Sequence, residues 1–450
     1  MKWKSTALGE VMRHRKGSIT IDDTTSYKLC RVQLHRRGVV LRQNLTGAAI
    51  STKKQQVCKA GDFLVAEMDA KVGGYGFVPA ELDGAIVSSH YYLFEVDSEK
   101  LHSEYLEVVS QAEILQQQIV AKGSTNYSSI RPGSVLEWQI PLPEDLEVQK
   151  QIARNFRAVQ SKLSVVCAEI THQQSLLAKL KQAILQEAIQ GKLTADWRAA
   201  HPDVEPASQL LHRIQAEKAR LIATKKLRPE KPLPKITPAE IPFEIPKGWE
   251  WCRFGQTIRL MNGNSFESGD FKKGTGVKCI KITNAGVGEF VETDDTLPLG
   301  FDKTYAKYQV FSGDLILALT RPYIATGLKI SRCPESYDGA LLNQRVAAIR
   351  PIDGILDSDF AFLFLGSDFV LRGYQAEFES KGQQPNLKSE HVTHLRLPLP
   401  PLAEQAAIVE RVEALMTTCR ALEAEIEHAR THAAHLLQAV LKEAFAPASA

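Results

Sequence analysis

The chain has 450 residues, of which 44% are hydrophobic and 24% are charged, and its formal net charge is only +3. This length predicts two or three domains with cores of their own, and the composition excludes a disordered or fibrous chain. The small net charge does not by itself indicate a polyanionic partner.

Seven cysteines are scattered along the chain without a Cys-x-x-Cys pair. This pattern argues against a disulfide framework or a zinc site and fits a reducing compartment. The first residues, Met1–Ser5, do not open an apolar signal segment, and no apolar run of membrane-spanning length follows. We therefore expect a cytoplasmic chain with no bound metal and no membrane association.

Residues 1–143 are rich in short apolar runs that lie between glycine, aspartate and asparagine turn signals. Runs such as Gly38–Leu41, Phe63–Ala66 and Tyr92–Val96 are typical of strands. The segment Ser103–Val120 instead has helical spacing. We expect one globular domain of mixed α and β structure here.

Residues 144–228 form a helical region that begins with one long helix, Leu146–Ile189. Its apolar positions alternate in steps of four and three, which is the period of a coiled-coil seam. A shorter helix is expected over Ala207–Thr224, where the apolar residues share one face. Residues 229–248 are rich in proline, which lacks an amide donor and fixes its φ, so this linker should be extended.

Residues 249–400 have the character of the first domain, with a strand-like run at Leu315–Leu319 and helical spacing over Ser358–Gly373. Three short motifs recur between the two domains: Gly61-Asp62 and Gly313-Asp314, Asp83-Gly84-Ala85 and Asp338-Gly339-Ala340, and Lys122-Gly123 and Lys381-Gly382. Across these motifs and the weaker match of Leu8-Gly9 with Phe254-Gly255, the offset drifts between 246 and 259 residues. The domains therefore repeat weakly, with insertions.

A second long helix, Leu402–Phe445, fills residues 401–446 and repeats the first helix at a constant offset of 256 residues. The predicted seam consists of Ile152, Phe156, Val159, Leu163, Val166, Ile170, Leu177, Leu180, Ile184, Ile408, Val412, Leu415, Leu422, Ile426, Leu436 and Val440. The linker should return the chain so that the helices pair antiparallel with a domain at each end. The predicted fold class is α/β (α+β), with two globular domains joined by a coiled coil in an internal repeat.

The sequence lacks the motifs of the common catalytic sites. It has no Gly-x-x-x-x-Gly-Lys-[Ser/Thr] phosphate loop, no His-Glu-x-x-His zinc motif, no dinucleotide-binding glycine motif and no Asn-Pro-Pro-aromatic motif of amino-methyltransferases. We therefore predict no catalytic residues in this chain.

Four segments resemble type I restriction-modification specificity subunits. The stretch Leu397–Gln405, which reads Leu-Pro-Leu-Pro-Pro-Leu-Ala-Glu-Gln, is similar to the opening of that family's conserved helices. Lys181–Thr194 resembles its central conserved region, and Pro242–Trp249 and Gly382–Leu387 are also similar to the family. The first helix opens with Pro141–Gln149, a degenerate version of the same pattern.

The resemblance implies two target recognition domains that each read one half of a bipartite DNA site, with the helix pair setting the spacer. It also implies two methyltransferase (modification) subunits docked on the helices, and restriction/translocase subunits. S-adenosylmethionine, ATP and Mg²⁺ would then be bound by the partner subunits, which carry adenine-N6 methylation and cleavage.

Candidate DNA contacts are basic and amide side chains that cluster within each domain. Arginine and lysine neutralise phosphates, whereas arginine also reads guanine and asparagine or glutamine reads adenine. The candidates are Arg31, Arg36, Arg37, Arg42, Lys53 and Lys54 in the first domain, and Lys278, Lys281, Asn284, Arg321, Tyr323, Asn343, Gln344, Arg345, Lys381, Gln383 and Gln384 in the second.

Two other functions are compatible with the same sequence. One is a coiled-coil scaffold or adaptor whose two domains bind proteins. The other is the specificity component of a type II-like restriction system. DNA binding by the assembled complex separates the scaffold from the DNA-reading subunits, and the cleavage position separates the two restriction systems.

Overall fold

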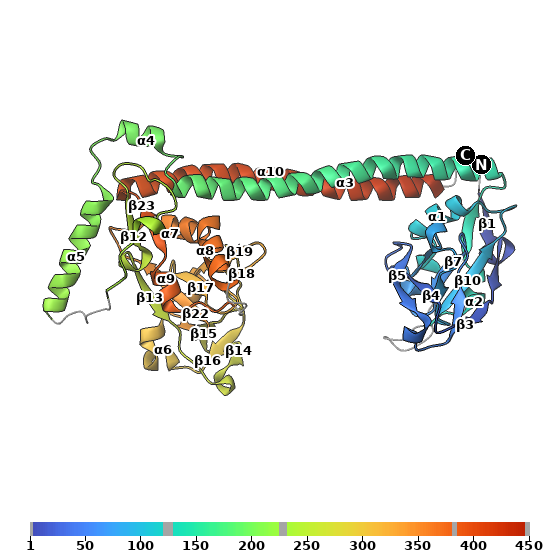
Figure 1. Cartoon of the computed structure of the whole chain (residues 1–450), viewed down its shortest axis with the longest axis horizontal. Helices are drawn as coiled ribbons and strands as arrows, with labels where there is room; N and C mark the ends of the chain where they lie inside the picture. The colour runs from blue at the N-terminus through green and yellow to red at the C-terminus, as the bar shows by residue number, and fades with distance from the viewer. Residues whose placement is uncertain (1–2, 120–128, 225–231, 380–384, 446–450) are drawn as a thin grey trace. The chain divides into compact units, whose positions relative to one another are not determined.

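The computed structural model describes residues 3–119, 129–224, 232–379 and 385–445 (Figure 1). The chain divides into two compact units. Unit 1 contains residues 1–172 and 426–450, and unit 2 contains residues 173–425. Each unit contains one globular domain and one part of each long helix, and unit 2 also contains the segment between the first long helix and the second domain.

The two long helices and the helix predicted over Ala207–Thr224 agree closely with the expected segments, whereas several short helices were not predicted. The α-helices are α1 (Ser103–Gln111), α2 (Pro132–Leu136), α3 (Leu146–Ile189), α4 (Ala195–Ala200), α5 (Ala207–Ala223), α6 (Phe301–Thr304), α7 (Ser358–Leu365), α8 (Asp368–Glu379), α9 (Ser389–Thr393) and α10 (Leu402–Phe445). The predicted helix over Ser103–Val120 is shorter in the structure, and the one over Ser358–Gly373 is two helices. None of the helices in the described ranges is long and apolar enough to cross a membrane.

The strands of unit 1 form three sheets. The strands are β1 (Lys4–Ala7), β2 (Met12–Arg15), β3 (Ser18–Thr20), β4 (Ser26–Val32), β5 (Val39–Thr46), β6 (Lys54–Val57), β7 (Phe63–Ala66), β8 (Tyr75–Phe77), β9 (Ile86–Val87), β10 (Tyr91–Val96) and β11 (Gln139–Leu142). Their orders are β1-β11, β2-β10-β7-β8 and β3-β6-β9-β4-β5.

The strands of unit 2 repeat this plan. They are β12 (Glu250–Arg253), β13 (Ile258–Asn262), β14 (Lys272–Lys273), β15 (Val277–Ile280), β16 (Asp295–Leu297), β17 (Leu315–Ala318), β18 (Tyr323–Ile324), β19 (Gly327–Leu328), β20 (Ile330–Arg332), β21 (Leu341–Leu342), β22 (Val346–Pro351) and β23 (Arg396–Leu399). The sheets β12-β23 and β13-β22-β17-β20 correspond to β1-β11 and β2-β10-β7-β8. The other sheets of unit 2 are β14-β16-β15-β21 and β18-β19. In the first of these, the parallel pair of β15 with β21 corresponds to that of β4 with β9.

The helices α3 and α10 pair antiparallel within each unit. In unit 1 the start of α3 meets the end of α10, where Phe156 and Leu441 share one buried cluster. In unit 2 the end of α3 meets the start of α10, where Lys181 Nζ lies 2.6 Å from Glu423 Oε1. Helix α1 covers the pair in unit 1 through Val108, which packs in the same cluster as Phe156.

Only part of the predicted seam is buried. Buried seam residues are Phe156, Ile170, Leu177, Ile184, Ile408 and Val412, and partly buried ones are Ile152, Val159, Leu163, Ile426 and Val440. The expectation of burial is wrong for Leu415, Leu180, Leu422, Val166 and Leu436, which are 39–51% exposed. Two helices cover only one side of each other, so the flanks of a heptad stripe stay open unless a third element packs there.

Candidate nucleic-acid interface

Some of the predicted contacts of unit 2 lie around the residue that follows β17, Leu319. The Leu319 amide donates to Arg345 O at 2.9 Å, and its carbonyl accepts from the Leu387 amide at 2.7 Å. Arg321, two residues further on, donates its amide to Pro385 O at 3.1 Å. These bonds bring three segments distant in sequence to one junction at the ends of β17 and β22.

Several exposed polar side chains surround this junction in unit 2. Gln344, Arg345 and Arg321 are exposed, and Arg321 has a φ of +48°. A non-glycine residue in the left-handed region costs on the order of 1–3 kcal/mol, which the bond to the Pro385 carbonyl helps to offset. Tyr323 begins β18 in the loop after Arg321. Asn343 is half-buried, and its Oδ1 accepts the Gln344 amide at 2.7 Å.

The other candidates of unit 2 have structural partners or lie outside the described residues. Asn284 is fully buried, and its side chain accepts from the Lys281 amide and donates to Val291 O. It therefore has no group left for a base, which corrects the prediction for this residue. Lys281 Nζ lies 2.8 Å from Asp295, and its charge lowers the pKa of that carboxyl through a hydrogen bond. Lys278 Nζ lies 4.4 Å from the centre of the Tyr337 ring. Lys381, Gln383 and Gln384 lie outside the described residues.

Unit 1 has the same junction at the equivalent strands. The Glu67 amide donates to His90 O at 2.9 Å, and the Glu67 carbonyl accepts from the Ile130 amide at 3.1 Å. The side chains differ from those of unit 2, because His90 Nδ1 lies 2.8 Å from Glu67 Oε2. Burial raises the pKa of Tyr92, and the nearby Glu67 carboxylate raises it further. Clusters of basic residues in the sequence do not indicate this pair, because its members lie 23 residues apart and one of them is acidic.

The basic residues of unit 1 lie mainly on the hairpin of β4 and β5. Arg31 and Arg37 are exposed, and Arg42 is the extra residue of a β-bulge on the edge strand β5. A bulge redirects a side chain from the regular pleat. Arg36 is held by structure instead, because its guanidinium donates to Gln116 Oε1 at 2.9 Å. The hairpin therefore offers three free basic groups and one anchoring arginine.

The tip of this hairpin has an unusual backbone. His35 and Arg36 have φ values of +59° and +62°. Their amides donate to Val72 O at 2.8 Å and Gly73 O at 3.0 Å. A Cβ at Gly73 would approach the Arg36 amide nitrogen to 2.8 Å, so glycine is required for this contact. The hairpin is thereby fixed against the loop that Glu67 begins.

Of the two neighbouring lysines, Lys53 is held by other residues of the fold, as Arg36 is, and Lys54 is exposed, as Arg31 is. Lys53 Nζ lies 2.5 Å from Asp23 and 2.8 Å from Gly47 O, so it closes a turn. Lys54 is exposed at the start of β6. The adjacent Gln55 is buried and donates to Thr52 O. Of these neighbours, only Lys54 extends a charge to solvent without such an anchor among the described contacts.

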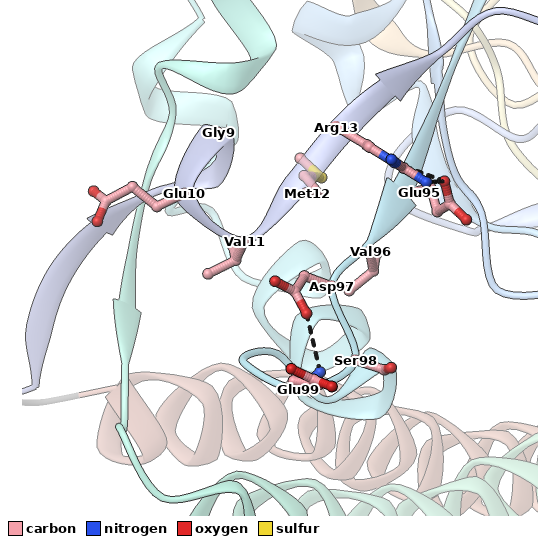
Figure 2. A pocket seen from close by; sticks show the side chains of 10 residues that line it. All are labelled: Gly9, Glu10, Val11, Met12, Arg13, Glu95, Val96, Asp97, Ser98 and Glu99. Carbon is pink, nitrogen blue, oxygen red and sulfur yellow. Dashed lines mark hydrogen bonds and ion pairs between the residues drawn. The ribbon is translucent and has the colours of Figure 1, made fainter.

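A hollow of about 490 Å³ in unit 1 has the opposite charge (Figure 2). It is lined by Glu10, Glu95, Asp97 and Glu99, with Arg13 paired to Glu95 at 2.7 Å. Arg13 lowers the pKa of the Glu95 carboxyl by donating a hydrogen bond. The excess of carboxylates disfavours a nucleic-acid backbone at this hollow.

Each domain is joined to its long helix by one buried glutamine. Gln149 donates to Pro143 O at 2.8 Å and accepts from the His102 amide at 2.8 Å. Gln405, at the offset of 256, donates to Pro400 O at 3.0 Å and accepts from the Asp357 amide at 2.7 Å. The repeat therefore preserves the joint that fixes each domain to its helix.

The start of α10 also holds the central region. The buried Glu404 carboxylate accepts from Thr194 Oγ1 at 2.7 Å, from Trp249 Nε1 at 2.8 Å and from Arg198. Gly191, with a φ of +69°, lies so close to Trp249 that a Cβ would clash. The first helix has Val148 at the position of Glu404. This replacement is one of the differences that make the opening of the first helix degenerate.

Comparison with known proteins agrees with this architecture. The family model described as "Type I restriction modification DNA specificity domain" matches residues 1–171 and 246–429. The type I restriction enzyme EcoAI specificity subunit of Escherichia coli is 34% identical over 262 residues, which cover 58% of this chain and 43% of that subunit. The MjaVIII specificity subunit of Methanocaldococcus jannaschii is 32% identical over 173 residues, covering 38% and 40%. The chain belongs to the type I restriction modification DNA specificity domain family.

Two solved structures share the fold along the whole chain. One, from work on complex assembly and conformational transition of the type I R-M system, has a TM-score of 0.65 at 18% identity, and covers 99% of this chain and 97% of that chain. The HsdS subunit from Thermoanaerobacter tengcongensis has a TM-score of 0.52 at 19% identity, covering 99% and 96%. By contrast, the chain spans less than half of the length of the EcoAI and MjaVIII subunits that it matches.

Proposed function

We propose that this chain is the DNA sequence-specificity subunit of a type I restriction-modification complex, and that it has no catalytic activity of its own. Each domain reads one half of a bipartite site in double-stranded DNA. The observation that carries the proposal is the repeated junction, in which two backbone hydrogen bonds of one domain match two of the other while the exposed side chains differ. A repeated scaffold with divergent polar groups suits the reading of two different half-sites.

The backbone of each junction is hydrogen-bonded. Exposed basic residues lie in the same domains. Arg31, Arg37, Arg42 and Lys54 in unit 1 would contact phosphates. Arg321 and Arg345 would supply the same charge in unit 2, and Arg345 also suits guanine. Family membership favours this reading over a protein-binding scaffold.

The long helices set the distance between the half-sites in this proposal. Inserting four residues near Val166 in α3 should change the spacer between the half-sites and leave each half-site sequence unchanged. Sequencing of methylated adenines in a host that expresses the chain with its modification subunits measures both. Altered half-site sequences would contradict the spacer role.

The open flanks of the helix pair are the proposed docking surface for two modification subunits. Leu422 and Leu436 are 46% and 51% exposed, so each offers apolar area that a partner helix could bury. The double variant Leu422→Ser/Leu436→Ser should unfold at nearly the wild-type temperature but recover less modification subunit on co-purification. The exposed polar residue Glu427 on the same helix provides a matched control, Glu427→Gln.

The partner subunits, in this proposal, bind S-adenosylmethionine, ATP and Mg²⁺, and further restriction/translocase subunits complete a cleaving complex. The test is a DNA shift and methylation assay with the purified complex. A complex that methylates one two-part sequence supports the proposal, and a complex that binds all sequences equally contradicts it. The position of cleavage relative to the site distinguishes this system from a type II-like one.

A further inference from the structure

The residue immediately before β10 in unit 1 and the residue before β22 in unit 2 occupy the same place in the repeat. These residues are His90 and Arg345, and the carbonyl of each accepts the amide of the residue that follows β7 or β17. Both side chains are exposed. The backbone therefore presents one polar side chain at the same point of each domain.

Their surroundings differ in hydrogen-bonding character. Arg345 is bonded through its backbone to Leu319, whose side chain cannot form a hydrogen bond. The Arg345 guanidinium itself can only donate. Beside His90 lies the Glu67 carboxylate, at 2.8 Å from Nδ1. An ionised carboxylate only accepts, so Nδ1 carries a proton, and whenever the ring carries only that proton Nε2 is an acceptor.

The Glu67 carboxylate contacts one edge of the histidine ring. Glu67 is 27% exposed and His90 is 73% exposed, so the carboxylate holds the inner edge of the ring while the outer edge faces solvent. An exposed ring with a fixed tautomer can discriminate a donor from an acceptor on a base edge. A histidine that is free to change its tautomer would pair with a donor as readily as with an acceptor.

We propose that His90 is a specificity-determining contact of the first domain and that Glu67 is its positioning residue. This inference rests on the proposed function. His90 Nε2 would accept a hydrogen bond from an exocyclic amino group of a base in the major groove, either cytosine N4 or adenine N6. Arg345, at the equivalent point of the second domain, would donate to guanine.

The experiment compares His90→Ala, His90→Gln, Glu67→Gln and the reciprocal variant Arg345→Ala, each in the complex with its modification subunits. Methylated adenines are mapped by sequencing, and binding is measured on oligonucleotides that carry single base-pair changes. We expect His90→Ala to reduce discrimination at one base pair of one half-site by about tenfold and to leave the other half-site unchanged. Arg345→Ala should relax only the other half-site.

A positioning role predicts a further result. Glu67→Gln should relax the same base pair as His90→Ala, and the double variant should be no more relaxed than His90→Ala alone. Non-specific binding should change little, since neither residue supplies a fixed positive charge. A purely structural effect would instead lower the affinity for all sequences together.

The outcomes separate the two proposals. A wild-type complex without any sequence preference would overturn the proposed function. A wild-type complex with a two-part site, together with His90→Ala and His90→Gln variants whose sites match the wild type, would overturn the inference alone. Relaxation of the same half-site by the His90 and Arg345 variants would overturn it as well.

Discussion

Replacement of Glu404 by glutamine tests whether the buried carboxylate at the start of α10 holds the central region. The carboxylate accepts from Thr194, Arg198 and Trp249, and its side chain is 1% exposed. Glutamine has the same shape but only one acceptor oxygen. Its amide group would face the N–H of either Arg198 or Trp249, which leaves donors without an acceptor.

The expected loss follows from these contacts. Hydrogen bonds to a charged group contribute about 1.5–3 kcal/mol each, and a buried unsatisfied donor costs about 1–3 kcal/mol. Arg198 is 22% exposed, so water replaces part of its lost interaction. We therefore expect Glu404→Gln to lower the free energy of unfolding by about 2–4 kcal/mol. For a unit of this size that corresponds to a decrease of roughly 6–12 °C in the melting temperature.

The assay is thermal unfolding of the full chain, combined with hydrogen exchange of the backbone. Exchange should accelerate in α4 and near Trp249, the segments that the carboxylate holds. Glu410→Gln is the matched control, because Glu410 is exposed on the same helix and should change stability by less than about 0.5 kcal/mol. If Glu404→Gln and the control melted at the same temperature, the assignment of a holding role to Glu404 would be refuted.

Three other predictions concern stability. Hydrogen bonds from the Thr237 backbone and from Arg253 lower the pKa of Glu240 from 4.5 to about 2; since the folded pKa lies below the unfolded one, this contribution is present above pH 4.5 and is lost as the pH falls toward 2. Urea midpoints of the wild type and Glu240→Gln should therefore differ at pH 7 and converge near pH 2, and a constant difference would contradict the linkage. Gln149→Ala and Gln405→Ala should each cost about 2–4 kcal/mol and accelerate hydrogen exchange only in the domain that the glutamine anchors; acceleration in both domains would argue against separate joints. Phe156→Ala should cost about 3–5 kcal/mol by urea unfolding, since its ring is 2% exposed in the cluster of α1, α3 and α10; a cost below 1 kcal/mol would show that this cluster does not hold the helix pair.

The long helices could be predicted from sequence because their signal is local. The predicted ranges Leu146–Ile189 and Leu402–Phe445 are the observed ones. The apolar period and the flanking prolines lie within each segment, so no distant contact is needed to read them. Burial along the seam was less predictable, because it depends on which neighbours cover each flank. Leu436 and Ile184 both occupy predicted seam positions, yet only Ile184 is buried.

The candidate site was predicted unevenly for a similar reason. Clusters of polar residues in the sequence identify Arg345 and Arg321. The two residues come together only through backbone hydrogen bonds that join the end of β17 to the residue before β22 and to Pro385 and Leu387, more than 60 residues after β17. Asn284 shows the opposite error, since an amide side chain that suits adenine in principle is bound inside the fold. The pair of Glu67 and His90 has no signal in composition. Its only signal is positional, namely the place before β10 that Arg345 occupies before β22.

A buried aspartate at the same position of each domain keeps its backbone hydrogen bond but has a different arginine partner. Asp62 and Asp314 both accept the amide three residues earlier, from Lys59 at 2.7 Å and from Phe311 at 2.9 Å. Each is also paired with an arginine, but Asp62 pairs with Arg15 of β2 whereas Asp314 pairs with Arg350 of β22, whose counterpart in unit 1 is β10.

The turn is therefore retained while the source of the neutralising charge has changed, because only the turn depends on backbone geometry. The same division holds at the junctions, where the backbone bonds of Glu67 and Leu319 coincide and their side chains do not. The exposed side chains at these junctions, His90 and Arg345, are under no constraint from the shared backbone hydrogen bonds to differ. Under the proposed function, their divergence would follow from the different half-sites that the two domains read.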